Sequence, residues 1–292
     1  MPTCAFLSMD SLANFVSYDH LAMDALRGLG WQVEEVSWRN ELVEWNAYNL
    51  VIIRTTWDYQ QDPEHFLSVL SKIEESDAHL ENDLELIRWN LNKSYLRELE
   101  VGGAEIVPTI WEPGFSEANF YDWFDWLATA EIIVKPLVSA NADFTYRLAI
   151  DTPKTKVKNL AGVFANKPFL VQPFMPKIVS EGEFSVFFFG QDYSHTILKT
   201  PATGDFRVQE EHGGHIQSVR PSNHLLATAQ QVFELIKPTP LYSRIDLVQT
   251  EKNSFALMEV ELIEPSLYFS YSSQSAQLFA NAVEQRVAAR AQ

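Results

Sequence analysis

Residues 254–265 read Ser-Phe-Ala-Leu-Met-Glu-Val-Glu-Leu-Ile-Glu-Pro, an apolar run interrupted by glutamates. The run has the composition of a β-strand, and side chains two residues apart on a strand point to the same face. Glu259 and Glu261 are therefore expected side by side. Two carboxylates at that spacing repel each other unless a cation lies between them. The pair predicts a seat for Mg²⁺, which takes oxygen ligands and commonly binds together with substrate phosphates.

A third acid lies on the preceding apolar segment. Strands are predicted over residues 244–250 and 255–263, around the sequence Glu-Lys-Asn-Ser, which is typical of a hairpin turn. In such a hairpin Asp246 approaches the face that carries Glu259 and Glu261, and three convergent acids strengthen the metal interpretation. The alternative is a solvated sheet face, or one on which Arg and Lys side chains pair with the acids.

The charge balance disfavours two classes of partner. The chain of 292 residues has 22 Lys plus Arg against 39 Asp plus Glu, a formal net charge of −17. Nucleic acids and anionic membranes are bound by basic surfaces, so neither is expected. The single cysteine, Cys4, lies in an apolar run, where a buried and inert thiol is expected. Without a signal-peptide pattern or a long apolar span, a cytoplasmic protein is expected.

The first ninety residues alternate between predicted strands and helices. Strands are predicted over 3–7, 31–38 and 50–53, with a helix over 11–29 and another that starts at Asp62-Pro63. Aspartate is a good N-cap and proline is favoured in the first turn. Such alternation is typical of an open parallel sheet with helices on its faces. We therefore predict an α/β fold, with a first domain over residues 1–92.

Two further lobes are predicted, over residues 93–172 and 173–292. The first contains predicted helices over 90–100 and 119–127 and a strand over 131–137. The aromatic stripe of the second helix is expected to belong to a core. From residue 169 onward the pattern is rich in strands, at 169–173, 183–189 and 193–200, before a helix over 223–236.

Cationic side chains that suit phosphate groups occur in two further places. Lys135 ends an apolar strand, where a buried ammonium needs a partner; a surface lysine with a buried stem is the alternative. A later segment holds Lys199, Arg207, Gly213 and Gly214. Glycine permits close backbone approach to a ligand, and the arginine fork suits phosphate or carboxylate. An ordinary surface loop is the alternative for this segment.

Taken together, these residues resemble the ATP-grasp superfamily, and most of all its glutathione-synthetase-like ligases. The terminal metal motif of that family, Glu-x-Asn-x-x-x-Pro, is matched by Glu259, Glu261 and Pro265, with glutamate in place of the usual asparagine. Asp246 resembles the family's first metal-binding acid. The resemblance implies an ATP-grasp fold behind an N-terminal open parallel-sheet domain. It also implies ATP and Mg²⁺ as cofactors, with Mn²⁺ as an alternative metal.

The resemblance implies a role for several other residues in nucleotide binding. Lys93 and Lys135 stand at the places of the two nucleotide-binding lysines, and Ser139-Ala-Asn-Ala142 resembles the loop that closes over the phosphates, here with little glycine. Residues 171–178 resemble the hinge that binds adenine. The implied nucleotide contacts there are Gln172, Pro173, Phe174 and Met175, with Glu181 and Glu183 both candidates for the ribose.

Further roles concern the transferred phosphoryl group and the second substrate. Lys199 and Arg207 resemble the cations that contact the phosphoryl group, and Gly213 and Gly214 are candidates for substrate contact.

The loop Arg54-Thr-Thr-Trp-Asp-Tyr59 follows the last strand of the first domain. Ligands collect beyond the carboxyl ends of strands in open α/β sheets, so this loop is expected to face the cleft. The matching loop of glutathione-synthetase-like proteins approaches the acceptor substrate, which implies that Arg54 holds a carboxylate and Asp58 an amino group. The alternative is that Trp57 and Tyr59 pack the domain junction. This loop and residues 263–268 also resemble the O-ureido-serine cyclo-ligases of cycloserine biosynthesis.

The resemblance therefore implies an ATP- and Mg²⁺-dependent carboxylate–amine ligase for a small, amino-acid-like substrate. Such enzymes activate a carboxylate as an acylphosphate that a nitrogen nucleophile displaces, and they work mainly by positioning and electrostatics. The alternatives are a nucleotide-binding regulatory protein without turnover and a kinase that stops at phosphoryl transfer. The sequence leaves open the acid, the amine, a cyclisation and a homodimer.

Overall fold

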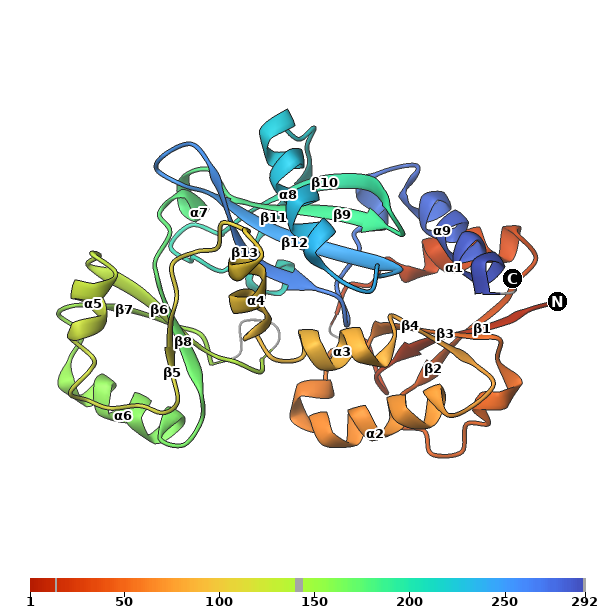
Figure 1. Cartoon of the computed structure of the whole chain (residues 1–292), viewed down its shortest axis with the longest axis horizontal. Helices are drawn as coiled ribbons and strands as arrows, with labels where there is room; N and C mark the ends of the chain where they lie inside the picture. Colours follow the sequence, from red (N-terminus) through yellow and green to blue (C-terminus); the bar gives the residue numbers. More distant parts are fainter. Residues whose placement is uncertain (14, 140–143, 291–292) are drawn as a thin grey trace.

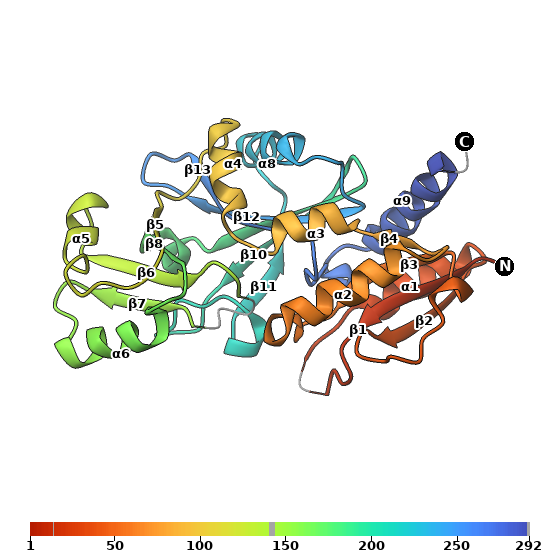
Figure 2. The same cartoon turned by 60° about the horizontal axis from the view of Figure 1, so that its bottom comes forward.

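The computed structural model describes residues 1–13, 15–139 and 144–290, and its strands form three separate sheets (Figure 1). An N-terminal sheet has the order β2-β1-β3-β4, a small sheet the order β5-β8-β6-β7, and a central sheet the order β11-β10-β9-β12-β13. Figures 1 and 2 both show the central sheet between the other two along the molecule. The fold is α/β, as predicted.

The N-terminal sheet is parallel throughout, which confirms the predicted open α/β arrangement. Its strands are β1 (Thr3–Ser8), β2 (Gln32–Ser37), β3 (Leu50–Thr55) and β4 (His79–Glu81), with the helices α1 (Asp19–Gly28) and α2 (Pro63–Glu74) between them. The apolar strands β1 and β3 are buried, and Cys4 is fully buried as predicted. Asp62 caps α2 by accepting a hydrogen bond from the amide of His65.

The first helix is shorter than predicted, since it begins at Asp19 rather than Ser11. The Ser17 hydroxyl accepts a hydrogen bond from the amide of Asp19, and the Asp19 carboxylate pairs with Arg54. The ring of Phe15, upstream of the helix, packs on Trp57 at 5.3 Å between centroids. Tertiary contacts thus hold the preceding segment outside the helix.

The small sheet is antiparallel and is covered by two helices. Its strands are β5 (Ile110–Glu112), β6 (Glu131–Pro136), β7 (Tyr146–Ala149) and β8 (Phe169–Pro173), and its helices are α5 (Asp122–Trp126) and α6 (Lys154–Phe164). Phe120, Trp123 and Phe124 are buried in one cluster with residues of β6 and β8. The aromatic stripe is therefore core, as predicted.

The central sheet is antiparallel, and its two faces have different coverings. Its strands are β9 (Glu183–Phe189), β10 (Asp192–Thr200), β11 (His215–Ser218), β12 (Tyr242–Gln249) and β13 (Phe255–Glu261). The helices α4 (Tyr95–Val101) and α8 (Asn223–Leu235) pack on one face, where they meet Val186 and Phe188. On the other face Phe187 and Phe189 pack with α9 (Ser275–Arg290) and the N-terminal domain.

Only part of that second face is filled by apolar packing. Side chains two residues apart share a face of a strand, so Glu183 and Ser185 lie on the same side as Phe187. The acidic residues of β9, β12 and β13 are thus placed on the remaining part of this face, beside the small sheet.

The helix predicted over residues 90–100 begins only at Tyr95, as α4, and a separate helix that was not predicted, α3 (Leu84–Asn90), precedes it. Between them the Asn92 side chain accepts a hydrogen bond from the amide of Ser94, a local bond that competes with the helical pattern. The Asn90 amide group also donates to Val260 O of β13. The break matters for the site because Lys93 lies inside it.

Short helical turns complete the described structure: α7 (Lys177–Ser180) and four 3₁₀ turns at Trp45–Ala47, Tyr59–Gln61, Glu210–His212 and Phe269–Tyr271. Among the residues described, no helix has both the length and the apolar character needed to cross a membrane.

Candidate functional site

One pocket is lined by residues from all three parts of the molecule. Ile133 comes from the small sheet, Met258 from the central sheet, and Trp57 and Tyr59 from the N-terminal domain. Twelve residues predicted from the sequence line it together: Lys93, Lys135, Ser139, Gln172, Pro173, Phe174, Met175, Glu183, Lys199, Arg207, Glu259 and Glu261. The pocket thus gathers residues that are far apart along the chain.

The hairpin of β12 and β13 sets the positions of the acids. Its register pairs Asp246 with Glu259 and Arg244 with Glu261. Glu259 and Glu261 line the pocket side by side, as their spacing predicted, while Asp246 is 3% exposed and does not line it.

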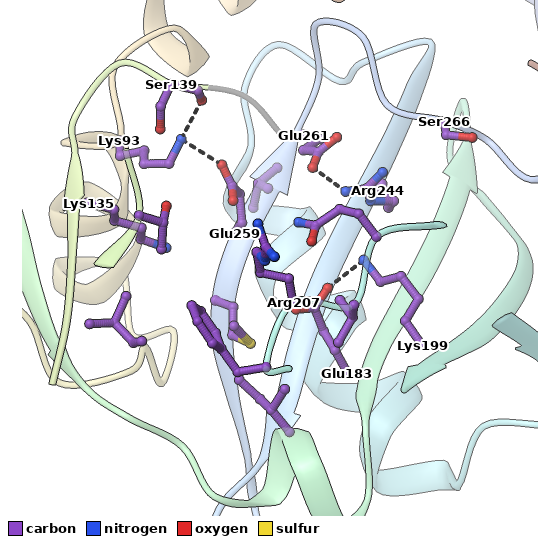
Figure 3. A pocket seen from close by; sticks show the side chains of 18 of the residues that line it. Lys93, Lys135, Ser139, Glu183, Lys199, Arg207, Arg244, Glu259, Glu261 and Ser266 are labelled. Atoms are coloured by element: carbon purple, nitrogen blue, oxygen red, sulfur yellow. Dashed lines mark hydrogen bonds and ion pairs between the residues drawn. The ribbon is translucent and has the colours of Figure 1, made fainter. Parts of the chain in front are cut away.

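Each of the three acids forms an ion pair with a cation of the protein, and Figure 3 marks the pairs of Glu259 and Glu261. Glu259 accepts from Lys93 Nζ at 2.9 Å, Glu261 pairs with Arg244, and Asp246 lies 3.0 Å from Arg244 Nη2. No three His, Cys, Asp or Glu side chains within residues 1–13, 15–139 and 144–290 have the arrangement of a metal site. The structure therefore contains the paired face that the sequence left open, and metal binding by the three acids stays a prediction.

Two lysines continue this network on either side of the acids. Lys199 is 3% exposed, pairs with Glu183 and lies 3.4 Å from Asp246. Lys93 Nζ also donates to the backbone oxygen of Ser139 at 2.9 Å, which ties the break between α3 and α4 to the small sheet. Figure 3 shows Lys93 and Lys135 on one side of Glu259, with Arg244 and Lys199 on the other.

Lys135 and Arg207 differ in how their charges are compensated. Lys135 is 9% exposed, and within the described parts of the chain no ion pair of it is found. Burial lowers the pKa of Lys135, a shift that Glu259 opposes and Lys93 reinforces. Arg207 pairs with Asp205 at 2.7 Å and keeps a side-chain exposure of 39%. Both cations line the pocket and suit an anionic ligand.

The carboxylates differ in the direction in which the protein shifts their pKa values. Burial raises the pKa of Glu261 to about 7, despite the attraction of Arg244. Burial and the neighbouring Glu261 raise the pKa of Glu264 well above its usual value. Burial also acts on Glu259, but Lys93 and Lys135 outweigh it and lower the pKa of that residue. Acids are thus in excess around Glu261 and Glu264, where a bound cation would be favoured.

Arg244 and Glu264 line the pocket and were missed by the sequence interpretation. Arg244 had a signal, because its spacing of two from Asp246 places both side chains on one strand face. Glu264 had none of this kind, because β13 ends at Glu261 and the chain turns before residue 264.

An apolar slot lies beside the charged part of the pocket. It is lined by Val107, Met175, Ile178, Val208 and Met258, which cluster together. Next to it, Gln172 donates a hydrogen bond to the Thr109 hydroxyl at 2.9 Å. A slot of this kind, with polar groups at its rim, suits a planar heterocycle attached to phosphates.

Several predicted residues lie outside the pocket. Glu181 is exposed and pairs with Lys177 at 3.5 Å, so of the two ribose candidates only Glu183 lines the pocket. Gly213 and Gly214 also lie outside it, and they shape the neighbouring loop instead. Gly213 has a φ of +78°, and a Cβ on Gly214 would lie 2.0 Å from Val208 O.

Arg54 and Asp58, which were predicted to contact substrate, form hydrogen bonds inside the protein. Arg54 is 1% exposed and donates two hydrogen bonds to Asp19, at 3.0 and 3.2 Å. Asp58 accepts from Arg39 and from the Trp38 indole, each at 2.7 Å. Neither lines the pocket, although their loop neighbours Trp57 and Tyr59 do.

Of the predicted phosphate-covering loop, Ser139 to Ala142, only Ser139 falls within the described residues.

Comparison with known proteins shows what this chain resembles in sequence and in fold. Residues 4–82 match the family model of the D-cycloserine synthetase DcsG, N-terminal domain. The cycloserine biosynthesis protein DcsG of Streptomyces lavendulae is 27% identical over 96% of this chain and 98% of its own. A crystal structure of D-cycloserine synthetase DcsG superposes with a TM-score of 0.86 at 25% identity, covering 98% of this chain and 99% of the other.

More distant structures share the fold. The ATP-grasp ligase PsnB, complexed with a minimal precursor, Mg and ADP, has a TM-score of 0.67 at 14% identity over 98% of each chain. The macrocyclase MdnC of Microcystis aeruginosa, bound to its precursor peptide MdnA, has a TM-score of 0.69 at 15% identity, over 97% of this chain and 99% of that one. The predicted ATP-grasp fold and the resemblance to its ligases are confirmed.

Proposed function

We propose that this chain, which has the ATP-grasp fold and resembles ATP-dependent C–N ligases along its whole length, joins a carboxylate to a nitrogen nucleophile at the expense of ATP. The substrate is small and amino-acid-like. The similarity to D-cycloserine synthetase, at a TM-score of 0.86, supports this class over the peptides bound by the more distant relatives.

The observation that carries the proposal is the composition of the pocket. An apolar slot, five cationic side chains and two adjacent glutamates line one cavity. The slot around Met175 and Met258 would take the adenine, and Glu183 would face the ribose. Lys93, Lys135, Lys199 and Arg207 would steer the phosphates.

The donor set also fits Mg²⁺. Glu259 and Glu261 present carboxylate oxygens to the pocket, and burial together with the charges of Asp246 and Glu259 raises the pKa of Glu261, an effect that a bound cation would oppose. Asp246 lies behind them and would complete the set, as the resemblance implies. When bound, Mg²⁺ would neutralise charge on the terminal phosphates of ATP.

The proposed chemistry has two steps. A carboxylate oxygen of the substrate attacks the γ-phosphorus of ATP and ADP leaves, which gives an acylphosphate. The nitrogen then attacks the acyl carbon and gives up a proton, the C–N bond forms, and the acyl C–O bond breaks so that inorganic phosphate leaves with that oxygen. Lys199 and Arg207 would stabilise the charge that develops in both steps, so the chain needs no nucleophile of its own.

Release of ADP tests this proposal. The protein is given ATP, Mg²⁺ and a panel of amino acids and their derivatives, and ADP formation that depends on one of them supports a ligase. Hydroxylamine should intercept the acylphosphate as a hydroxamate. A nucleotide that raises the melting temperature without any ADP release would instead indicate a silent binding protein, and a stable phosphate ester would indicate a kinase.

A further inference from the structure

Side chains from the end of β3, from the loop after it and from the start of β12 hold the pocket wall that follows β13. Each of three consecutive backbone oxygens of this wall lies within hydrogen-bond distance of a side-chain donor from another part of the chain. The Tyr242 hydroxyl lies 2.9 Å from Ile263 O, the Trp57 indole donates to Glu264 O at 2.8 Å, and Arg54 Nη2 donates to Pro265 O at 2.9 Å.

Two of these donors, Arg54 and Tyr242, are held in turn by other contacts inside the protein. Arg54 is 1% exposed, its two hydrogen bonds to Asp19 anchor it to the start of α1, and it lies over the Tyr242 ring at 5.0 Å. The Tyr242 hydroxyl also lies 2.6 Å from Ile53 O, the last residue before Arg54. The N-terminal sheet and the central sheet therefore meet in one buried hydrogen-bonded unit.

We call the three donors Arg54, Trp57 and Tyr242 the clamp. The segment that they hold continues into residues whose side chains line the pocket. Glu264, Ser266 and Tyr268 all line it, as do Trp57 and Tyr59 from the N-terminal domain. Lys93 and Lys135, which are proposed to steer the phosphates, come from other elements, and within the described residues neither forms a hydrogen bond or an ion pair with Arg54, Trp57 or Tyr242. The clamp therefore bears on the part of the pocket wall that carries Glu264, Ser266 and Tyr268.

We propose that Arg54 and Trp57 are positioning residues, which hold the backbone at Glu264 and Pro265 so that this segment shapes the acceptor-substrate end of the pocket. Arg54 does not contact substrate, because it is 1% exposed and does not line the pocket, and its Nε and Nη2 already donate to Asp19 and Pro265. The kinetic part of this inference rests on the proposed ligase function, whereas the structural part does not.

The structural part is tested by NMR of the indole groups. The chain has eight tryptophans, so the Trp57 indole N–H resonance can be assigned by its loss in Trp57→Phe. We expect Arg54→Met to shift this resonance and to speed its exchange with solvent. Arg286→Met is the matched control, since Arg286 also donates to a backbone oxygen, Thr239 O at 2.7 Å, and does not line the pocket. An unchanged Trp57 resonance in Arg54→Met would overturn the clamp.

The kinetic part is tested by separating the two substrates. Once the acceptor has been identified from ADP release, Arg54→Met should raise the KM for this acceptor by roughly tenfold or more, because one charged hydrogen bond is lost. The Kd of Mg·ADP should stay within about twofold of the wild-type value. Arg286→Met should change neither. If the KM for the acceptor and the Kd of Mg·ADP rose by the same factor, Arg54 would be a residue of general stability, and the inference would be refuted.

The Asp19→Asn variant distinguishes positioning from direct substrate binding. If Arg54 positions the wall, Asp19→Asn raises the acceptor KM as Arg54→Met does, and the double variant is little worse than either single one. If Arg54 bound the substrate carboxylate, Asp19→Asn would leave the KM unchanged or lower it. When the wild-type protein forms no ADP with any acceptor, the ligase proposal fails, and the indole resonance still decides the clamp.

Discussion

Replacing Glu261 with glutamine should stabilise the metal-free protein, and by more at alkaline than at acidic pH. The pKa of Glu261 is raised from 4.5 to about 7, because burial and the neighbouring Asp246 and Glu259 outweigh the attraction of Arg244. An acid whose pKa is raised on folding binds its proton more tightly in the folded state. Its contribution therefore lowers stability as the pH rises from 4.5 to 7, and levels off above that window.

The size of the effect follows from the two pKa values. A shift from 4.5 to about 7 corresponds to about 3 kcal/mol at about pH 8.5 and about 1 kcal/mol at about pH 5.5. Glutamine removes the charge and keeps the shape, and Arg244 retains Asp246 at 3.0 Å. The gain in the free energy of unfolding should thus grow by roughly 2 kcal/mol between these two pH values.

Urea unfolding in EDTA at both pH values measures this gain, and Glu259→Gln on the same strand is the control with the opposite sign. The pKa of Glu259 is lowered, because Lys93 and Lys135 outweigh burial, so its charge is favourable in the folded state. Its removal leaves the buried Lys93 without a carboxylate and should destabilise the protein. A Glu261→Gln variant that is less stable than wild type at both pH values would refute this reasoning.

Three further outcomes are expected. Lys93→Met should weaken ADP binding by about tenfold or more, because Lys93 joins Glu259 to the small sheet; calorimetry measures this, and Lys177→Met, in an exposed pair, should bind as wild type does. Gly214→Ala should lower the melting temperature, since its Cβ would overlap a backbone oxygen of the same loop, whereas Gly162→Ala, in the open part of a helix, should raise it by the equivalent of about 1 kcal/mol. Removal of Mg²⁺ with EDTA should abolish ADP release, and Mg²⁺ should restore it; release that persists in EDTA would contradict the assigned metal.

Local periodicity made much of the fold predictable. The parallel N-terminal sheet follows from buried apolar runs between helices, and the β12–β13 hairpin follows from two apolar strands around a polar turn. Predictions were less accurate where a tertiary contact ends a regular element. The break that contains Lys93 depends on hydrogen bonds of neighbouring asparagine side chains, one of them to β13.

The candidate site was predictable in its residue types and less so in its pairings. The spacing of Glu259 and Glu261 determined that both side chains share a strand face, because a strand repeats every two residues. Only the tertiary structure decided which cation meets which acid. Lys93 reaches Glu259 and Arg244 reaches Glu261, so the excess charge falls on Glu261.

The sequence by itself determined the ATP-grasp resemblance and the glutamate pair, because both are encoded in short segments with a fixed period or order. The tertiary structure decided the use of Arg54, which has the chemistry of a carboxylate-binding residue and is instead buried between Asp19 and Pro265. It also brought Glu264 into the pocket beyond the end of β13. Both depend on how the N-terminal domain packs against the central sheet, and that packing joins residues which no local pattern connects.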